Sequence, residues 1–257
     1  MSVRILKTAA LVGVAIVTPA ALAQTVVNVG PGVVIPNGTD LPNGATVNVS
    51  DGGTIGLGVD LSNGTLNITG GNVALGATGI ASGFTNSNNN VNVTGGNVGP
   101  FFQFFNGSRG TLSGGTRNTF GVFSGSSVTA DGSTITGFAD VFSGGRFTLA
   151  GGDVASFRAL SGSTIDIIGT EFAFGGTPID LDIGETIVFS GRNQLLTATL
   201  ADGSFFDHAL RSFDPGFPTP DVALPSATLR LTRVVPSPSG ASLLALGALV
   251  TLRRRRA

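Results

Sequence analysis

A turn of small residues recurs along the chain at nearly constant spacing, and this period constrains the fold more than any other feature. Successive turns lie 20, 19, 24, 18, 19 and 18 positions apart. The turn glycines, each preceded by Asn or Ser, are Gly44, Gly64, Gly83, Gly107, Gly125, Gly144 and Gly162. The long interval contains the polar segment 84–90, which we interpret as an insertion. A period of this length is typical of a solenoid, in which each unit is one coil.

Two columns of large apolar residues keep the same period. One column contains Phe102, Phe120, Phe138 and Phe157, and the other contains Phe105, Phe123, Phe142 and Leu160. A β-prone stretch follows each turn, and glycine-rich corners follow the stretch. We therefore predict an all-β fold, a parallel β-helix of about seven coils over residues 44–171 with like residues about 4.8 Å apart. A β-sandwich would explain the alternation but not the columns.

The right-handed form of the β-helix is favoured, because the six-residue aliphatic–glycine repeat of left-handed forms is missing. After Phe172 the period ends and antiparallel signals replace it. Strands are expected at 185–189, 194–200 and 227–233, with a hairpin turn at Asp202-Gly203. We predict a small antiparallel β cap over residues 172–234 and an N-terminal cap over residues 24–43, since exposed coil edges invite aggregation.

The N-terminal end has the features of an export signal. Two basic residues precede an apolar stretch, and small residues at Ala21 and Ala23 occupy the positions that signal peptidase reads. We predict a signal peptide over residues 1–23, with the mature chain beginning at Gln24. The protein is then exported, and signal peptidase is one of its partners.

The C-terminal end, residues 235–257, has three parts. The motif Val235-Pro236-Ser237-Pro238 precedes a twelve-residue apolar run, which ends at a basic cluster of Arg253, Arg254, Arg255 and Arg256. As a helix the run spans about 18 Å, against about 30 Å of bilayer hydrocarbon. Positive flanks resist translocation, so the arginines would hold the end in the cytoplasm. The tail is expected to anchor the chain in the membrane until an enzyme removes it.

This tail resembles the PEP-CTERM sorting signal, in which a Pro-Glu-Pro motif, an apolar helix and an arginine cluster are handled by an exosortase. The resemblance covers residues 235–257 alone, and Ser237 stands where the family usually has Glu. It implies an exosortase-like processing enzyme as a partner. It also implies a surface or extracellular-matrix protein of a Gram-negative-type bacterium, often linked with exopolysaccharide.

The charge of the mature body excludes one class of partner. Between Gln24 and Pro236 the chain has eight arginines, no lysine and fifteen carboxylates, a net charge of −7. Nucleic-acid binding needs a basic face, so we expect none. The chain has no cysteine, so an exported form has no disulfides and must be stabilised by burial and repetition.

Few residues suggest chemistry, and we expect neither catalytic residues nor a cofactor. His208 is the one histidine; a Ser-His-Asp triad is the nucleophilic arrangement it could join, but no G-x-S-x-G motif is present. We expect it to be a partly exposed strand residue. Asp180, Asp182 and Glu185 offer oxygen ligands at near-alternate positions, a weak calcium candidate without the twelve-residue loop of EF-hands.

Carboxylates on neighbouring coils raise an enzymatic alternative. Asp131, Asp140 and Asp153 lie near Arg146 and Arg158 in successive repeats, and two of them could reach one glycosidic bond. This pattern would suit a polysaccharide lyase or glycoside hydrolase, although Asp also serves turns. The favoured hypothesis is an exported structural or adhesion protein that presents a polar face to polysaccharide. A self-assembling envelope coat protein is the third hypothesis.

Overall fold

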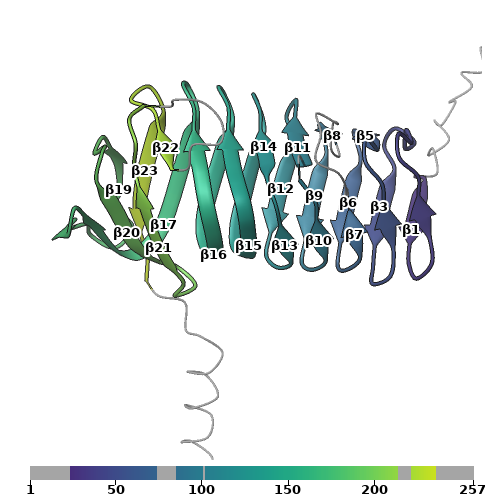
Figure 1. Ribbon diagram of the computed structural model, residues 1–257, viewed down its shortest axis with the longest axis horizontal. Helices are drawn as coiled ribbons and strands as arrows, with labels where there is room; N and C mark the ends of the chain where they lie inside the picture. Colours follow the sequence, from purple (N-terminus) through teal and green to yellow (C-terminus); the bar gives the residue numbers. More distant parts are fainter. Residues whose placement is uncertain (1–23, 74–84, 101, 214–220, 236–257) are drawn as a thin grey trace, which may run out of the picture.

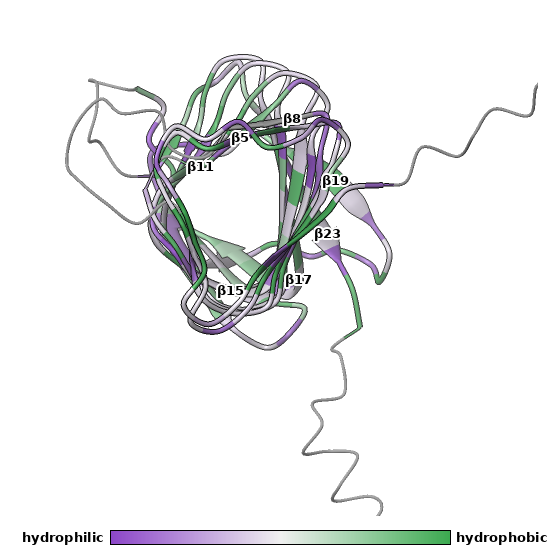
Figure 2. Ribbon diagram, turned by 90° about the vertical axis from the view of Figure 1, so that its right-hand side faces the viewer, coloured by the Kyte–Doolittle hydropathy of each residue, from purple (hydrophilic) through white to green (hydrophobic). Residues whose placement is uncertain are grey.

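The computed structural model describes residues 24–73, 85–100, 102–213 and 221–235, and every regular element among them is a β-strand. The strands stack in parallel as a β-solenoid of about seven coils, which confirms the predicted fold. Figure 1 shows the coils side by side along the long axis of the molecule, and Figure 2 looks along that axis. Each coil contributes short strands to three faces of the rod.

The first face is the longest stack, with one strand before and one strand after the seven predicted coils. Its strands pair in parallel and in register from one coil to the next. They are β1 (Val26–Val29), β3 (Thr46–Val49), β6 (Thr65–Ile68), β9 (Asn90–Val93), β12 (Arg109–Leu112), the first parts of β15 (Ser127–Val141), β16 (Arg146–Ala159) and β17 (Thr164–Phe174), and β23 (Thr228–Arg233).

The second and third faces consist of shorter strands in the same parallel register. The second face contains β2 (Val34–Ile35), β4 (Thr54–Ile55), β7 (Asn72–Val73), β10 (Asn97–Val98), β13 (Thr116–Arg117) and the middle of β15 and β16. The third face contains β5 (Asp60–Ser62), β8 (Thr85–Ser87), β11 (Phe102–Phe105), β14 (Phe120–Val122), the ends of β15 and β16, and β22 (Val222–Ala223).

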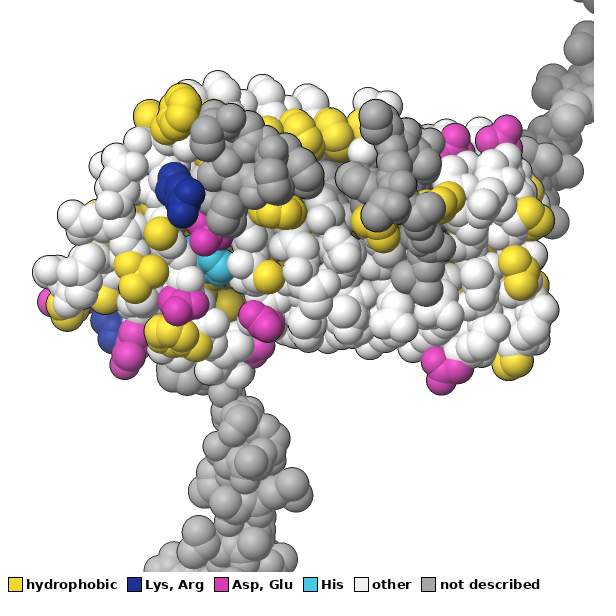
Figure 3. Space-filling model, viewed as in Figure 1, with side chains coloured by type: hydrophobic (Ala, Val, Ile, Leu, Met, Phe, Trp, Pro, Cys, Tyr) yellow, Lys and Arg dark blue, Asp and Glu magenta, His cyan; other side chains and the backbone are white. Residues whose placement is uncertain are grey.

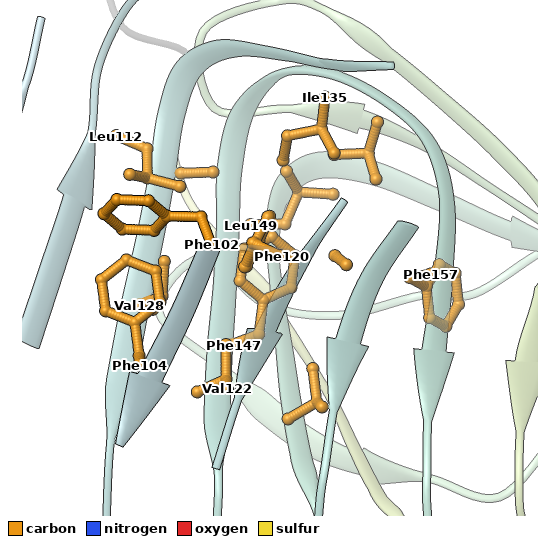
Figure 4. Packing of buried hydrophobic residues seen from close by; sticks show 14 of the residues in the cluster. Phe102, Phe104, Leu112, Phe120, Val122, Val128, Ile135, Phe147, Leu149 and Phe157 are labelled. Atoms are coloured by element: carbon orange, nitrogen blue, oxygen red, sulfur yellow. The ribbon is translucent and has the colours of Figure 1, made fainter. Parts of the chain in front are cut away.

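The core is a set of aliphatic and aromatic ladders along the inside of the rod. Alternate residues of each short strand point inward, so the β-period of two places one apolar residue of each coil above the last. On the first face, for example, Val49, Ile68 and Val93 stack in register and are all buried. Figure 4 shows the aromatic part of this core, where Phe102, Phe104, Phe120 and Phe147 gather between coils. Burial of these ladders stabilises the coils without disulfides.

One aromatic column lies on the outside of the third face. The rings of Phe105 and Phe123 stack with centroids 4.2 Å apart, and those of Phe123 and Phe142 stack at 4.3 Å. All three side chains are half-buried. This confirms the second predicted column. The first column differs by one member: Phe120 pairs with Ala139, which pairs with Phe157, because a register shift in β15 moves Phe138 opposite Ser156.

The insertion also lies at a different place from the predicted one. Asn67 and Asn92 occupy equivalent positions 25 residues apart, whereas Asn48 and Asn67 are 19 apart. The predicted insertion at 84–90 is wrong for most of its length, because β8 and the start of β9 occupy it. The extra residues fall between β7 and β8. The turn position assigned to Gly83 belongs to Asn88, which lies two residues before the in-register Asn90 and has a positive φ like the turn glycines Gly44 and Gly107.

The ends of the solenoid are built differently from the two predicted caps. Residues 24–43 form no separate cap, because β1 and β2 are the first coil and pair in parallel with the second.

In the 172–234 region the predicted antiparallel strands are present: β20 (Leu195–Leu200) pairs with β17 and β21 (Phe205–Ala209), and β19 (Thr186–Phe189) pairs with β23. The short β18 (Thr177–Pro178) also pairs with β17. However, β22 and β23 are parallel additions to β16 and β17, so the chain returns from the cap to form a last coil.

Arg192 fastens this last coil to the cap. Its guanidinium donates hydrogen bonds to the carbonyl oxygens of Ala223, Leu224 and Ala227, at 2.6, 3.3 and 3.3 Å, and to those of Phe189 and Gly191. Burial lowers the pKa of Arg192. One side chain thus donates to carbonyls on both sides of the cap boundary.

Candidate functional site

The outward side of the first face carries a continuous polar ladder. We define the amide–hydroxyl ladder as Asn28, Asn48, Asn67, Asn92, Thr111, Thr129 and Thr148, which are in register on successive coils. Asn48 Nδ2 donates to Asn28 Oδ1 at 2.9 Å, Asn67 to Asn48 at 2.9 Å, and Asn92 to Asn67 at 3.0 Å. In-register stacking places identical amides where each can bond the next. The remaining donors and acceptors point to solvent along a straight line.

Charged residues extend this ladder toward the cap. Asp166 follows Thr148 in the column, and Arg230 follows Asp166. The Asp166 carboxylate accepts from Arg146 Nε and Arg230 Nε, each at 2.5 Å. The hydrogen bond that Arg230 donates to Asp166 raises the pKa of Arg230, against a smaller lowering by burial. The Arg146 side chain remains 53% exposed, so its other guanidinium nitrogens face solvent.

Arginine therefore outnumbers carboxylate along these outward columns. Arg109 lies in the column beside the ladder, in register with Ser127 and then Arg146. With Arg146, Arg230 and Asp166 this gives three positive charges and one negative charge, on a body whose net charge is −7. The first face is thus a polar, locally positive strip on an acidic molecule.

The residues considered for glycosidic cleavage are on different faces. Arg146 is paired with Asp166 on the first face, and exposed Asp153 lies in an outward column of the second. Asp140 lies on the third face, 3.7 Å from Arg158. Both members of that pair are buried. Exposed Asp131 opposes Gly151. The parallel stacking therefore brings Asp140 and Arg158 together but does not gather the five predicted residues on one face.

His208 is buried, which corrects the expectation of a partly exposed residue. Its Nδ1 lies 2.8 Å from Asp221 Oδ1, and its ring packs against Phe157 and Phe206 with centroids 5.5 and 4.5 Å away. Ser156 Oγ accepts from the backbone N–H of Asp221 at 3.1 Å. The arrangement holds a His–Asp pair and a serine, but Ser156 contacts the amide of Asp221, not the imidazole. The pair joins β21 to the segment before β22.

The weak calcium candidate forms a turn. Glu185 Oε2 accepts from the backbone N–H of Asp182 at 2.7 Å, and the Glu185 N–H donates to the Asp182 carbonyl at 2.9 Å. Across residues 24–73, 85–100, 102–213 and 221–235, no group of three or more His, Cys, Asp or Glu side chains is placed to hold a metal ion. Asp180 lies nearby at the edge of a cleft.

This cleft, which we call the cap cleft, has a volume of about 350 Å³. Its floor is the outward side of the cap sheet, where Glu171 on β17 opposes Thr199 on β20, and Thr199 opposes Phe205 on β21. Residues 178–180 and Arg233 form the rim. This site was not predicted from the sequence, although the alternation in 195–200 and 205–209 indicated which side chains share a face.

Most of the predicted processing residues lie outside the described part. These are Ala21, Ala23, Pro236, Ser237, Pro238, Arg253, Arg254, Arg255 and Arg256. Gln24 is described, and its side chain donates to Thr46 Oγ1 at 2.8 Å. Val235 follows β23 and is 62% exposed. Among the described residues, no helix is long and apolar enough to cross a membrane.

Comparison with protein-family models, with curated proteins and with solved structures finds no match to this chain.

Proposed function

We propose that the protein is an exported structural or adhesion protein of the cell surface or extracellular matrix, which contacts exopolysaccharide through its first face. The observation that carries the proposal is the amide–hydroxyl ladder with its neighbouring arginines. Straight rows of amides and hydroxyls match the hydroxyl-rich surface of a glycan chain. Accessible guanidinium groups pair with carboxylates. An acidic polysaccharide lying along the rod is the ligand that these groups favour.

The charge distribution supports this choice of face. On the side of the molecule that Figure 3 shows, the visible dark-blue Lys and Arg side chains lie at the cap end and the coils are mostly white, so the described residues of this side form no positive strip along the coils. A body with a net charge of −7 repels polyanions in general. Binding of an acidic chain thus requires the local positive strip.

A matched pair of variants tests the face. Thr129→Glu places a carboxylate in the middle of the first face, whereas Thr134→Glu places the same charge on the second face of the same strand. We expect the mature protein to sediment with insoluble polyuronate, Thr129→Glu to lower the bound fraction several-fold, and Thr134→Glu to leave it nearly unchanged. Equal loss in both variants, or no binding by the parent, contradicts the proposal.

The sorting part of the proposal concerns the two ends of the chain. The first described strand begins at Val26 and the last one ends at Arg233, and the two predicted signals belong almost entirely to the residues outside the described part. We expect the intact mass of the mature protein to begin at Gln24 and to end near Pro236. Deletion of 253–256 should keep the protein from the surface. A tail that stays uncut in a membrane-bound protein contradicts exosortase-like sorting and indicates a simple anchored envelope protein.

Self-assembly is a second candidate function, favoured by the first coil. Among the described residues β1 and β2 each pair on one side only, and Val26 and Val34 are 56% and 63% exposed. The other end carries the antiparallel strand β19 over β23. An open edge can pair with another chain, so copies would meet through their first coils. Sedimentation velocity of the mature protein and of Val34→Lys tests this; a monomeric parent contradicts it.

A further inference from the structure

We propose that the cap cleft is a binding site for an amino-sugar unit of a polysaccharide, separate from the first face. The cleft lies on the outward side of the cap sheet, whereas Leu196 and Leu200 on the opposite side are buried. Its volume of about 350 Å³ is at the small end of the range for ligand sites, about 300 to 1,000 Å³. This size suits one sugar unit of a longer chain.

Three polar side chains of the cleft have no protein partner. In the described structure, the carboxylates of Glu171 and Asp180 make no ion pair or hydrogen bond, and neither does the hydroxyl of Thr199. Arg233 also lines the cleft, but its guanidinium donates to the carbonyl oxygens of Thr170 and Leu181. The cleft therefore offers acceptors and negative charge, which a ligand with an ammonium group and hydroxyls would satisfy.

Phe205 supplies an apolar platform beside these acceptors. Its side chain is 64% exposed, and it makes no ring contact with the other described aromatic residues. The column of Phe105, Phe123 and Phe142 differs, because those rings stack face to face on one another. The open Phe205 face can receive the C–H side of a pyranose ring and attract its ammonium group. The carboxylates, the Thr199 hydroxyl and the Phe205 ring thus fit one class of ligand, a hexosamine.

Part of this inference rests on the proposed function, because both concern polysaccharide, but the two sites bind chains of opposite charge. The probes are a glucosamine tetramer, a glucose tetramer with the same linkage and a uronate tetramer, each titrated into the mature protein by calorimetry. We expect the glucosamine tetramer to bind at least tenfold more tightly than the glucose tetramer. The uronate tetramer should show no binding in the cleft.

Phe205→Ala separates specific binding from general attraction to an acidic body, because it changes no charge. We expect Phe205→Ala to weaken glucosamine-tetramer binding at least tenfold. The matched control is Phe213→Ala, since Phe213 is 71% exposed and does not line the cleft; it should bind like the parent. Glu171→Gln should reduce the preference for the amine over the neutral sugar. Thermal melting checks that each variant is folded.

Two results would overturn the inference. Equal binding of the glucosamine and glucose tetramers removes the amino-sugar assignment, and equal affinities in Phe205→Ala and Phe213→Ala remove the cleft as the site. Neither result bears on the first face, which is probed by polyuronate and Thr129→Glu. Conversely, loss of polyuronate binding in Thr129→Glu should leave the glucosamine titration unchanged.

Discussion

Arg117 occupies a core position that every neighbouring coil fills with an aliphatic residue. It is in register with Val98 on one side and Ile135 on the other, and it is 3% exposed. Its Nη1 donates to the Gly114 carbonyl at 2.8 Å, but its Nε and Nη2 have no partner. A buried charge without a counter-ion is costly. We predict that Arg117→Leu makes the protein more stable.

The magnitude follows from the electrostatics of the site. Burial lowers the pKa of Arg117 from its ordinary value to about 10, and each step of one in pKa corresponds to about 1.4 kcal/mol. The charged native state therefore carries a penalty of about 3 kcal/mol. Loss of the hydrogen bond to Gly114 costs about 1 kcal/mol. A net gain of about 2 kcal/mol remains, or about 4 to 8 °C in Tm for a domain of this size.

The destabilisation by Arg117 depends on pH, and the sign of this dependence follows from its lowered pKa. The folded state binds the proton of Arg117 more weakly than the unfolded state, so the penalty is fully present below pH 10. It shrinks as the pH rises above that value, and the advantage of Arg117→Leu over the parent should shrink with it. Melting curves by circular dichroism at pH 7 and at pH about 10.5 measure both effects.

Arg158→Leu is the control, because Arg158 is also buried but lies 3.7 Å from the Asp140 carboxylate. Removing this partner leaves a buried carboxylate, so we expect a loss of about 3 to 5 kcal/mol. The reasoning is refuted if Arg117→Leu lowers the Tm at pH 7. That result would mean that the guanidinium satisfies a group or bound anion worth more than its desolvation.

Three further predictions concern the coils and the cap. Gly115→Ala should lower the free energy of unfolding by more than roughly 2 kcal/mol, because the new Cβ would lie 2.6 Å from the Gly96 carbonyl oxygen. The control is Gly176→Ala, which has a similar positive φ but open space around it and should cost about 1 kcal/mol. Equal losses of the two variants in urea unfolding would argue against the clash. Arg192→Ala should remove the hydrogen-bond donor of the Ala223 and Ala227 carbonyls and cost about 1 to 3 kcal/mol, seen as faster amide exchange in β22 and β19; unchanged exchange would show that the guanidinium is dispensable. Asn67→Ala breaks two ladder hydrogen bonds and should lower stability by about 1 kcal/mol, whereas a neutral result in the same unfolding assay would mean that water replaces the ladder.

The sequence was most informative where one coil copies the next. Parallel stacking in register forces like residues together, so a period in the sequence becomes a column in space, and Phe105, Phe123 and Phe142 stack as predicted. The prediction of the column failed where two neighbouring coils are not in the same register. A register shift in β15 replaced Phe138 by Ala139 in the core column, and alternation along the chain does not reveal a bulge before the strands are paired.

The candidate sites depend on contacts that no period encodes. His208 and Asp221 are 13 residues apart and meet through the packing of the cap. Glu171, Thr199 and Phe205 form one floor because β20 pairs antiparallel with both β17 and β21. The position of Arg117 as a core residue was also invisible, because a polar side chain at an inward position breaks the pattern from which the core is inferred.

The sequence by itself determined that the chain repeats, that each repeat is a short-stranded β coil, and that residues after Phe172 leave the period. Local spacing contains this information, since it fixes which residues alternate and which recur. The tertiary structure decided that the chain returns from the cap to add β22 and β23 as a last parallel coil. It also decided which outward residues share a face. Both depend on pairing between distant segments, whose free energy comes from burial and hydrogen bonds that form only when the coils stack.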